Sequence, residues 1–83
     1  IDIGSADFIS ALYVGALIEE VDILDLEEHI DGTTHEDIQS VYLNLQWASG
    51  NHLRAFVRQL SFQGITYEPI LLDIDTFNAI MNR

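Results

Sequence analysis

Three side chains in this sequence have the types and spacing of a metal site: Glu19, Glu20 and His52. At about 100° per residue, Glu19 and Glu20 flank the apolar face of one helix, and His52 lies within that of a second. A buried carboxylate needs a partner, and a divalent cation is one. Carboxylate oxygen with imidazole nitrogen suits iron, manganese or zinc. Helical bundles build di-metal sites from these ligands, with Glu on two helices and Glu-x-x-His on the other two.

Each of these residues also has an interpretation without a metal. Glu19 and Glu20 could mark the rim where a buried segment becomes a solvated face. His52 could be a core histidine bonded to Tyr13, Tyr42 or a backbone carbonyl. We expect the other acidic residues of the two helices to form a solvated surface: Asp22, Asp25, Glu27, Glu28, Asp31, Glu36 and Asp37.

Two long helices and one short helix must position these residues. Apolar residues recur at helical spacing over residues 5–31 and 34–63, and a last helix of about two turns covers 75–82. Ser5 is the expected cap of the first helix, and Gly32 is expected to end it in the left-handed conformation. Gly64 ends the second helix. The short linker makes the pair an antiparallel hairpin, so the predicted fold class is all-α.

Local signals refine this arrangement. Thr34 with Asp37 predicts a capping box at the start of the second helix. Asp73 or Asp75 caps the last helix, whose expected packing face is Phe77, Ile80 and Met81. Glycine inside a helix costs about 1 kcal/mol relative to Ala, so we expect close helix packing at Gly15 and Gly50.

The predicted hairpin register separates the two halves of the site. With these helix ends, Glu19 lies level with Trp47, and His52 lies level with Val14. Glu19 and His52 are then offset by about 7.5 Å along the axis. A single ion bound by both would be awkward. Either the two residues hold opposite sides of a di-metal centre, or the hairpin register differs from this one.

Composition excludes several classes of function. The 83 residues carry a net charge of −11, and the formal cations are Arg54, Arg58 and Arg83. That argues against binding to nucleic acid or anionic membranes, whose affinity comes from basic side chains. The absence of cysteine excludes disulfides and thiolate chemistry. No apolar run approaches about 20 residues, so no transmembrane helix is predicted, and the compartment stays open.

The apolar content predicts a covering partner. Hydrophobic residues make up 48% of the chain, and residues 11–18 are apolar almost all round the helix. A two-helix hairpin cannot bury every face of such a segment. Because the chain begins at Ile1 without a Met, we expect a processed product or a fragment. The cover would then be a missing N-terminal half or a second copy in a homo-oligomer.

Three segments are distinctive together: VGALIEEVDI at 14–23, NHLRAFV at 51–57 and GITYEP at 64–69. They resemble an uncharacterised ferritin-like family of bacteria and archaea, a domain of unknown function. The resemblance implies that residues 1–83 are the C-terminal half of a four-helix bundle. Glu19 or Glu20 would be the third-helix carboxylate and His52 the fourth-helix histidine. Ser49 departs from the pattern, because Ser cannot replace the bridging Glu three residues before the histidine.

Two functions follow from these observations. The first is a metal-binding carboxylate bundle holding iron, or alternatively manganese or zinc. The resemblance implies dioxygen or peroxide chemistry of an oxidoreductase type, with Tyr13 or Tyr42 as donors behind the ligands. The second is a non-enzymatic helical interaction or assembly module with a vestigial metal site. Because half of the ligands would be missing, we expect the 83 residues alone to bind metal weakly or not at all.

Overall fold

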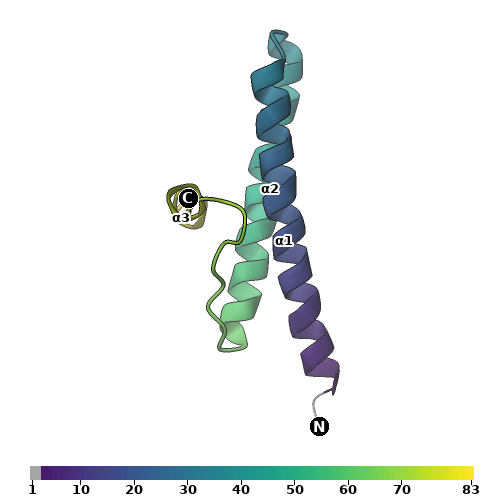
Figure 1. Cartoon of the computed structure of the whole chain (residues 1–83), viewed down its shortest axis with the longest axis vertical. Coiled ribbons are helices and arrows are strands. Elements are labelled where there is room, and N and C mark those ends of the chain that lie inside the picture. The colour runs from purple at the N-terminus through teal and green to yellow at the C-terminus, as the bar shows by residue number, and fades with distance from the viewer. Residues whose placement is uncertain (1–2) are drawn as a thin grey trace.

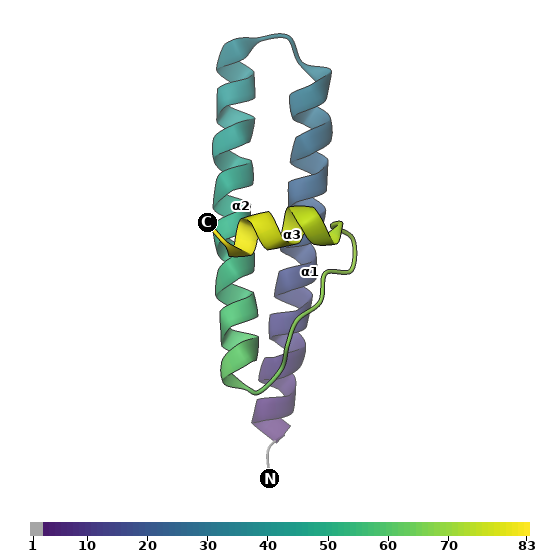
Figure 2. The ribbon, with the colours of Figure 1, turned by 90° about the vertical axis from the view of Figure 1, so that its left-hand side faces the viewer.

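The chain folds into two long antiparallel helices and a short helix that lies across them (Figure 1, Figure 2). The computed structural model describes residues 3–83, with side chains from Asp7 onward. The helices are α1 (Ile3–Gly32), α2 (Glu36–Phe62) and α3 (Ile74–Met81). The described part contains no strand, so the predicted all-α hairpin with a short C-terminal helix is confirmed. Since α1 begins at Ile3, Ser5 lies inside the helix, and its prediction as the cap is wrong.

The end of α1 differs from the prediction. Gly32 is the last residue of α1, but its backbone is not in the left-handed conformation. In the described part, the glycine with a positive φ is Gly64, at 79°. The side chain of Gln39 instead reaches back to the carbonyl groups there. Its Nε2 donates to the oxygen of Thr33 at 2.7 Å and of Ile30 at 3.4 Å. A side chain of α2 thus caps α1 and closes the hairpin.

The start of α2 also differs from the prediction. The N-cap residue is His35, whose side chain makes no capping hydrogen bond. The hydroxyl of Thr33 accepts from the N–H of His35 at 3.3 Å. The predicted capping box of Thr34 and Asp37 is therefore wrong, because α2 begins two residues after Thr34. The acidic first turn, with Glu36 and Asp37, is present and suits the positive end of the helix dipole.

The α1–α2 interface fixes how the two helices align. Gly15 makes room for Phe56, because a Cβ at Gly15 would lie 2.5 Å from the Phe56 ring. The predicted close helix packing at Gly15 is thereby confirmed. Nε2 of Gln46 donates to the carbonyl of Ile23 at 3.1 Å and to Glu27 at 2.8 Å. Around these contacts the buried core residues of the two helices are Leu12, Ala16, Ile23, Leu53 and Leu60.

Residues 65–73 form an irregular segment, the strap, that runs back along the hairpin from the end of α2 (Figure 2). Gly64, in the left-handed region, reverses the chain, and the N–H of Ile65 donates to the carbonyl of Leu60 at 3.0 Å. This confirms the prediction that Gly64 ends the helix. The strap buries Tyr67 and Leu72 against the hairpin.

Helix α3 is capped and packed as predicted. Asp73 is the N-cap residue, and its Oδ2 accepts from the N–H of Thr76 at 3.1 Å. Hydrogen bonds from the hydroxyl and the N–H of Thr76 hold the pKa of Asp73 below its usual value. Phe77 and Ile80 are buried, and Met81 is partly buried against the same core.

Only one side of the hairpin is covered within the described part, by the strap and α3 (Figure 1). In the predicted all-round apolar segment, Val14 and Ile18 are more than half exposed. On α2 the aliphatic side chains of Ile38, Val41 and Leu45 are also exposed. These surfaces are the ones for which a partner is predicted.

None of the helices in the described part is both long and apolar enough to cross a membrane. For residues 3–83, this agrees with the sequence, which predicts no transmembrane helix.

Candidate functional site

Glu20 is fully buried, with an exposed fraction of 0%, and the strap supplies its partners. Its carboxylate accepts a short hydrogen bond from the hydroxyl of Tyr67. Oε1 also accepts from the N–H groups of Leu71 and Leu72, each at 2.9 Å. The N–H of Ile70 lies 3.1 Å from both carboxylate oxygens. Both oxygens of Glu20 are therefore engaged by donors from residues 67–72.

These contacts keep the buried carboxylate ionised. Burial alone would raise the pKa of Glu20, because a low-dielectric site disfavours the charged form. The hydrogen bonds from Leu72, Tyr67 and the other two N–H groups outweigh burial and hold that pKa below its usual 4.5. Burial, and then the adjacent carboxylate, raise the pKa of Tyr67 well above its ordinary value. Glu20 is thus an anionic acceptor, and Tyr67 is its neutral donor.

Glu19 points to a different side of α1 and faces His52 on α2. Its Oε2 lies 3.5 Å from Nδ1 of His52. The side chain of Glu19 is 14% exposed, whereas that of His52 is 63% exposed. The structure therefore brings together Glu19 and His52, and it turns Glu20 toward the strap.

The predicted hairpin register is wrong. Glu19 lies opposite His52, and Trp47 lies farther along the hairpin toward the turn. The contacts of Phe56 with Gly15 and of Gln46 with Ile23 set this alignment. The offset predicted between Glu19 and His52 is therefore absent, and the two side chains can address the same space.

The aromatic residues considered as partners of His52 lie elsewhere. The ring of Tyr13 packs on Tyr67 with centroids 5.9 Å apart. Tyr42 stacks on His29 at 5.3 Å with an interplanar angle of 24°. Since His52 is mostly exposed and faces Glu19, its interpretation as a core histidine is wrong.

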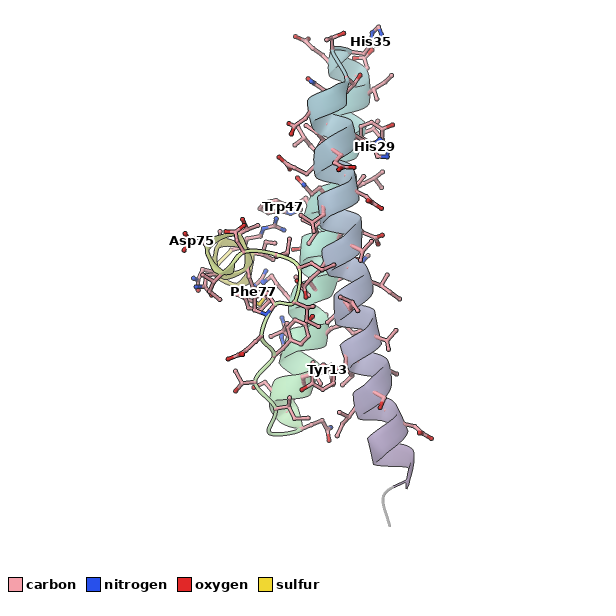
Figure 3. The ribbon with its side chains drawn as sticks, in the orientation of Figure 1. Tyr13, His29, His35, Trp47, Asp75 and Phe77 are labelled. Atoms are coloured by element: carbon pink, nitrogen blue, oxygen red, sulfur yellow. The ribbon has the colours of Figure 1, made fainter. Side chains whose placement is uncertain are left out.

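Glu19 and His52 lie in a shallow groove between α1 and α2, with a volume of about 560 Å³. The groove is on the side of the hairpin away from α3: its lining residue His29 and the α3-side residue Trp47 point in opposite directions (Figure 3). Asp22 and Ser49 are also in its lining. Within residues 3–83, no three acidic or histidine side chains are close enough together to hold an ion. The chain thus presents a pair of potential ligands rather than a complete site.

Gly50 does not make room for a second helix as Gly15 does, so the close helix packing predicted at Gly50 is wrong. A Cβ at Gly50 would lie 2.5 Å from the guanidinium of Arg83, so the glycine makes room for this side chain and not for another helix. The guanidinium carbon is 3.7 Å from the ring centroid of Trp47, and Nη1 donates to the Trp47 carbonyl at 3.1 Å. Burial, and then the charge of Arg54, lower the pKa of Arg83. Arg83 therefore fastens the end of α3 to α2.

Sequence reasoning missed the partners of Glu20. Tyr67 is 47 residues from Glu20, and the N–H of Leu72 is 52 residues away. The strap has no periodic pattern that would place it against one helix face, and three of its donors are backbone groups that no residue type reveals. The one signal in the sequence is Tyr67 itself. A tyrosine hydroxyl that becomes buried needs a hydrogen-bond partner, and a buried carboxylate such as Glu20 is a suitable one.

The fold and site define an all-α domain in which a C-terminal strap holds a buried carboxylate of a long helical hairpin. Residues 1–83 match the family described as Uncharacterized protein domain (DUF2202), and the chain belongs to that family. Over 79 residues it is 44% identical to the uncharacterized protein MJ0754 of Methanocaldococcus jannaschii, with 95% of this chain and 43% of that protein covered. The chain thus spans less than half of that relative.

A solved structure supports the same relationship. The crystal structure of hypothetical protein MJ0754 from Methanococcus jannaschii matches with a TM-score of 0.86 and 45% identity. The match covers 90% of this chain and 43% of that chain. The predicted membership of an uncharacterised domain family is therefore confirmed.

Replacing Tyr67 by Phe removes one donor from a charged, buried acceptor. We expect Tyr67→Phe to lower the free energy of unfolding by about 1.5 to 3 kcal/mol, the usual contribution of a hydrogen bond to a charged group. Tyr13→Phe is the matched control, because its ring packs on Tyr67 but its side chain is exposed, and we expect a change below about 0.5 kcal/mol. Urea unfolding of the protein expressed from its complete gene measures both. Equal effects of the two variants would contradict the role of Tyr67.

The ionised state of Glu20 predicts a pH dependence. Because the pKa of Glu20 is lower in the folded than in the unfolded chain, its stabilising contribution is present above the ordinary pKa and is lost as the pH falls. Glu20→Gln cannot ionise, so we expect the difference in unfolding free energy between wild type and this variant to shrink below about pH 4.5. Urea unfolding measured from neutral to acidic pH tests this. A difference that stays constant over that range would contradict it.

Proposed function

We propose that Glu19 and His52 supply two ligands of a metal centre in a ferritin-like four-helix bundle. In this proposal α1 and α2 are the third and fourth helices. The observation that carries it is the 3.5 Å approach of Glu19 Oε2 to His52 Nδ1 across the hairpin. The remaining ligands would come from two further helices, in a segment of the protein outside these 83 residues or in a second copy.

The distance fits two ligands of one ion. Metal bonds of about 2.1 Å to nitrogen and oxygen put neighbouring ligand atoms roughly 3.0 to 3.4 Å apart. The 3.5 Å separation of Glu19 and His52 needs little adjustment to reach that range. A carboxylate with an imidazole suits iron, with manganese and zinc as alternatives. Bound iron would supply redox chemistry toward dioxygen or peroxide.

The residues of this chain would have separate roles at such a centre. Glu19 would bring negative charge to the metal, and His52 would bring a neutral nitrogen donor. Glu20 contributes indirectly, because its oxygens are already engaged by the strap and it fixes the segment of α1 that carries Glu19. The exposure of His52 is the expected state of a ligand whose metal and partner helices are not part of this chain.

The surroundings of the pair support a bundle. Exposed aliphatic residues of α2 (Ile38, Val41 and Leu45) continue the side of the hairpin on which His52 lies. Two further helices packed there would bury these residues and reach Glu19 and His52 from the opposite side. The chain covers 43% of MJ0754, so more than half of that relative lies outside the matched part and is long enough for another helical pair.

Metal content of the whole protein tests the proposal. We expect the protein expressed from its complete gene to bind iron stoichiometrically after reconstitution. Glu19→Ala and His52→Ala should each weaken binding by at least about tenfold, because each removes one ligand. His35→Ala is the control, since His35 is an exposed histidine at the start of α2, and it should retain the metal. Elemental analysis after dialysis measures all four proteins.

Other outcomes of this experiment would overturn the proposal. A wild-type protein without iron, manganese or zinc after reconstitution would favour the non-enzymatic assembly module. Metal retained in full by both ligand variants would move the site away from Glu19 and His52. Circular dichroism of each variant separates the loss of a ligand from the loss of the fold.

A further inference from the structure

A hollow on the α3 side of the hairpin lies between the three helices and the end of the strap. Its volume is about 620 Å³, a size at which proteins bind small molecules. Its apolar lining consists of Ile23, Leu24, Trp47, Leu72, Ala79 and Ile80. Trp47, which points to the side opposite the Glu19–His52 groove (Figure 3), is 56% exposed. This large ring therefore presents apolar surface that the described part of the chain leaves uncovered.

Arg83 places a positive charge at the rim of the hollow. Among the side chains that the structure describes, no carboxylate lies within salt-bridge distance of this guanidinium. Its Nη1 donates to the carbonyl of Trp47 at 3.1 Å, and a guanidinium has further N–H groups for another acceptor. The guanidinium lies over Gly50, and Arg54 follows Gly50 by one helical turn. Two neighbouring cations without an acidic partner favour a bound anion.

The acidic residues in the lining already have hydrogen-bond partners. Glu27 accepts from Nε2 of Gln46 at 2.8 Å. The two oxygens of Asp73 accept from the N–H and the hydroxyl of Thr76, at 3.1 and 2.7 Å. Asp73 precedes α3 and Arg83 follows it, so a helix about 12 Å long separates the two charges. The hollow thus has apolar walls and one positive end.

We propose that this hollow binds a small amphipathic carboxylate, whose apolar body lies against Trp47 and Ile80 and whose carboxylate pairs with Arg83. A guanidinium can donate to both oxygens of a carboxylate in one plane. The net charge of −11 on the 83 residues disfavours a ligand with more than one negative charge. The site uses neither Glu19 nor His52, so it is independent of the proposed metal centre.

Octanoate is a probe with this chemistry. Octanol lacks its charge and acetate lacks its apolar body, so both are matched control ligands. The indole N–H resonance of Trp47, assigned by its loss in Trp47→Phe, reports binding in NMR titrations of the protein expressed from its complete gene. We expect octanoate to saturate with a Kd of about 1 mM or below. Octanol and acetate should each bind at least about tenfold more weakly.

Three variants locate the ligand. Arg83→Gln removes the pairing charge and should weaken octanoate binding by at least about tenfold. Arg58→Gln is the control, because it removes the same charge from an exposed position of α2 outside the hollow, and its affinity should stay within about threefold of wild type. Ala79→Phe fills the hollow and changes no charge, so octanoate and octanol should both bind at least about tenfold more weakly.

The results of these titrations stand whether or not the protein binds iron, so they are separate from the test of the metal centre. A Trp47 resonance that octanoate does not shift would overturn the proposed site, as would octanol binding as tightly as octanoate. Equal octanoate affinities of Arg83→Gln and Arg58→Gln would also overturn it. If Arg83→Gln detaches α3 from α2, Ala79→Phe still decides, because octanoate affinity retained in that variant would place the ligand outside the hollow.

Discussion

The buried carboxylate of Glu20 is the interaction on which the rest of this structure depends. A charged group without exposure is costly unless hydrogen bonds replace its lost hydration. The strap provides these bonds through Tyr67 and the successive N–H groups of residues 70–72, which converge on one anion. The strap has no regular hydrogen-bonding pattern of its own, so Glu20 also gives it a defined path along the hairpin. Because α3 follows the strap directly, this path places α3 across the two long helices, where Phe77 and Ile80 are buried in the core.

This constraint has a consequence for the adjacent residue. Neighbouring residues of a helix point about 100° apart, so an α1 that directs Glu20 into the strap must direct Glu19 to a different side. The alignment set by Gly15, Phe56 and Gln46 then places His52 next to Glu19. One acidic pair in the sequence therefore has two separate roles. Glu20 accepts the hydrogen bonds that hold the strap, and Glu19 faces His52 in the groove.

One side of the hairpin is covered, and the other side is exposed. One side is closed by the strap and α3, and Arg83 secures its end against Trp47 and Gly50. The other side carries the Glu19–His52 groove among exposed aliphatic residues such as Val41 and Leu45. An exposed apolar surface of this kind is typical of a site of interaction with another protein surface.

Helix periodicity made the hairpin and α3 predictable, since apolar spacing, Gly64 and Asp73 are local signals. The helix ends at Gly32 and His35 were not predictable, because the side chain of Gln39 supplies a cap that residue propensities do not reveal. An error there shifted the expected register and separated Glu19 from His52. The role of Glu20 was also beyond prediction, because most of its donors are backbone groups about fifty residues away. Glu19 and Glu20 are the same residue type, so the sequence does not distinguish them. Only their tertiary contacts differ: Glu20 bonds to the strap, and Glu19 faces His52.

The central claim is that Glu19 and His52 bind a metal while Glu20 holds the strap. Anomalous diffraction at the absorption edge of the bound metal tests this claim most directly. Crystals of the complete protein, reconstituted with iron, should show a peak at bonding distance, about 2.0 to 2.2 Å, from both Glu19 and His52. Glu20 should still accept its hydrogen bonds from the strap in the same crystal. A peak bound to Glu20, or no peak beside Glu19 and His52 in a protein that retains its iron, would contradict the separate roles of the two carboxylates.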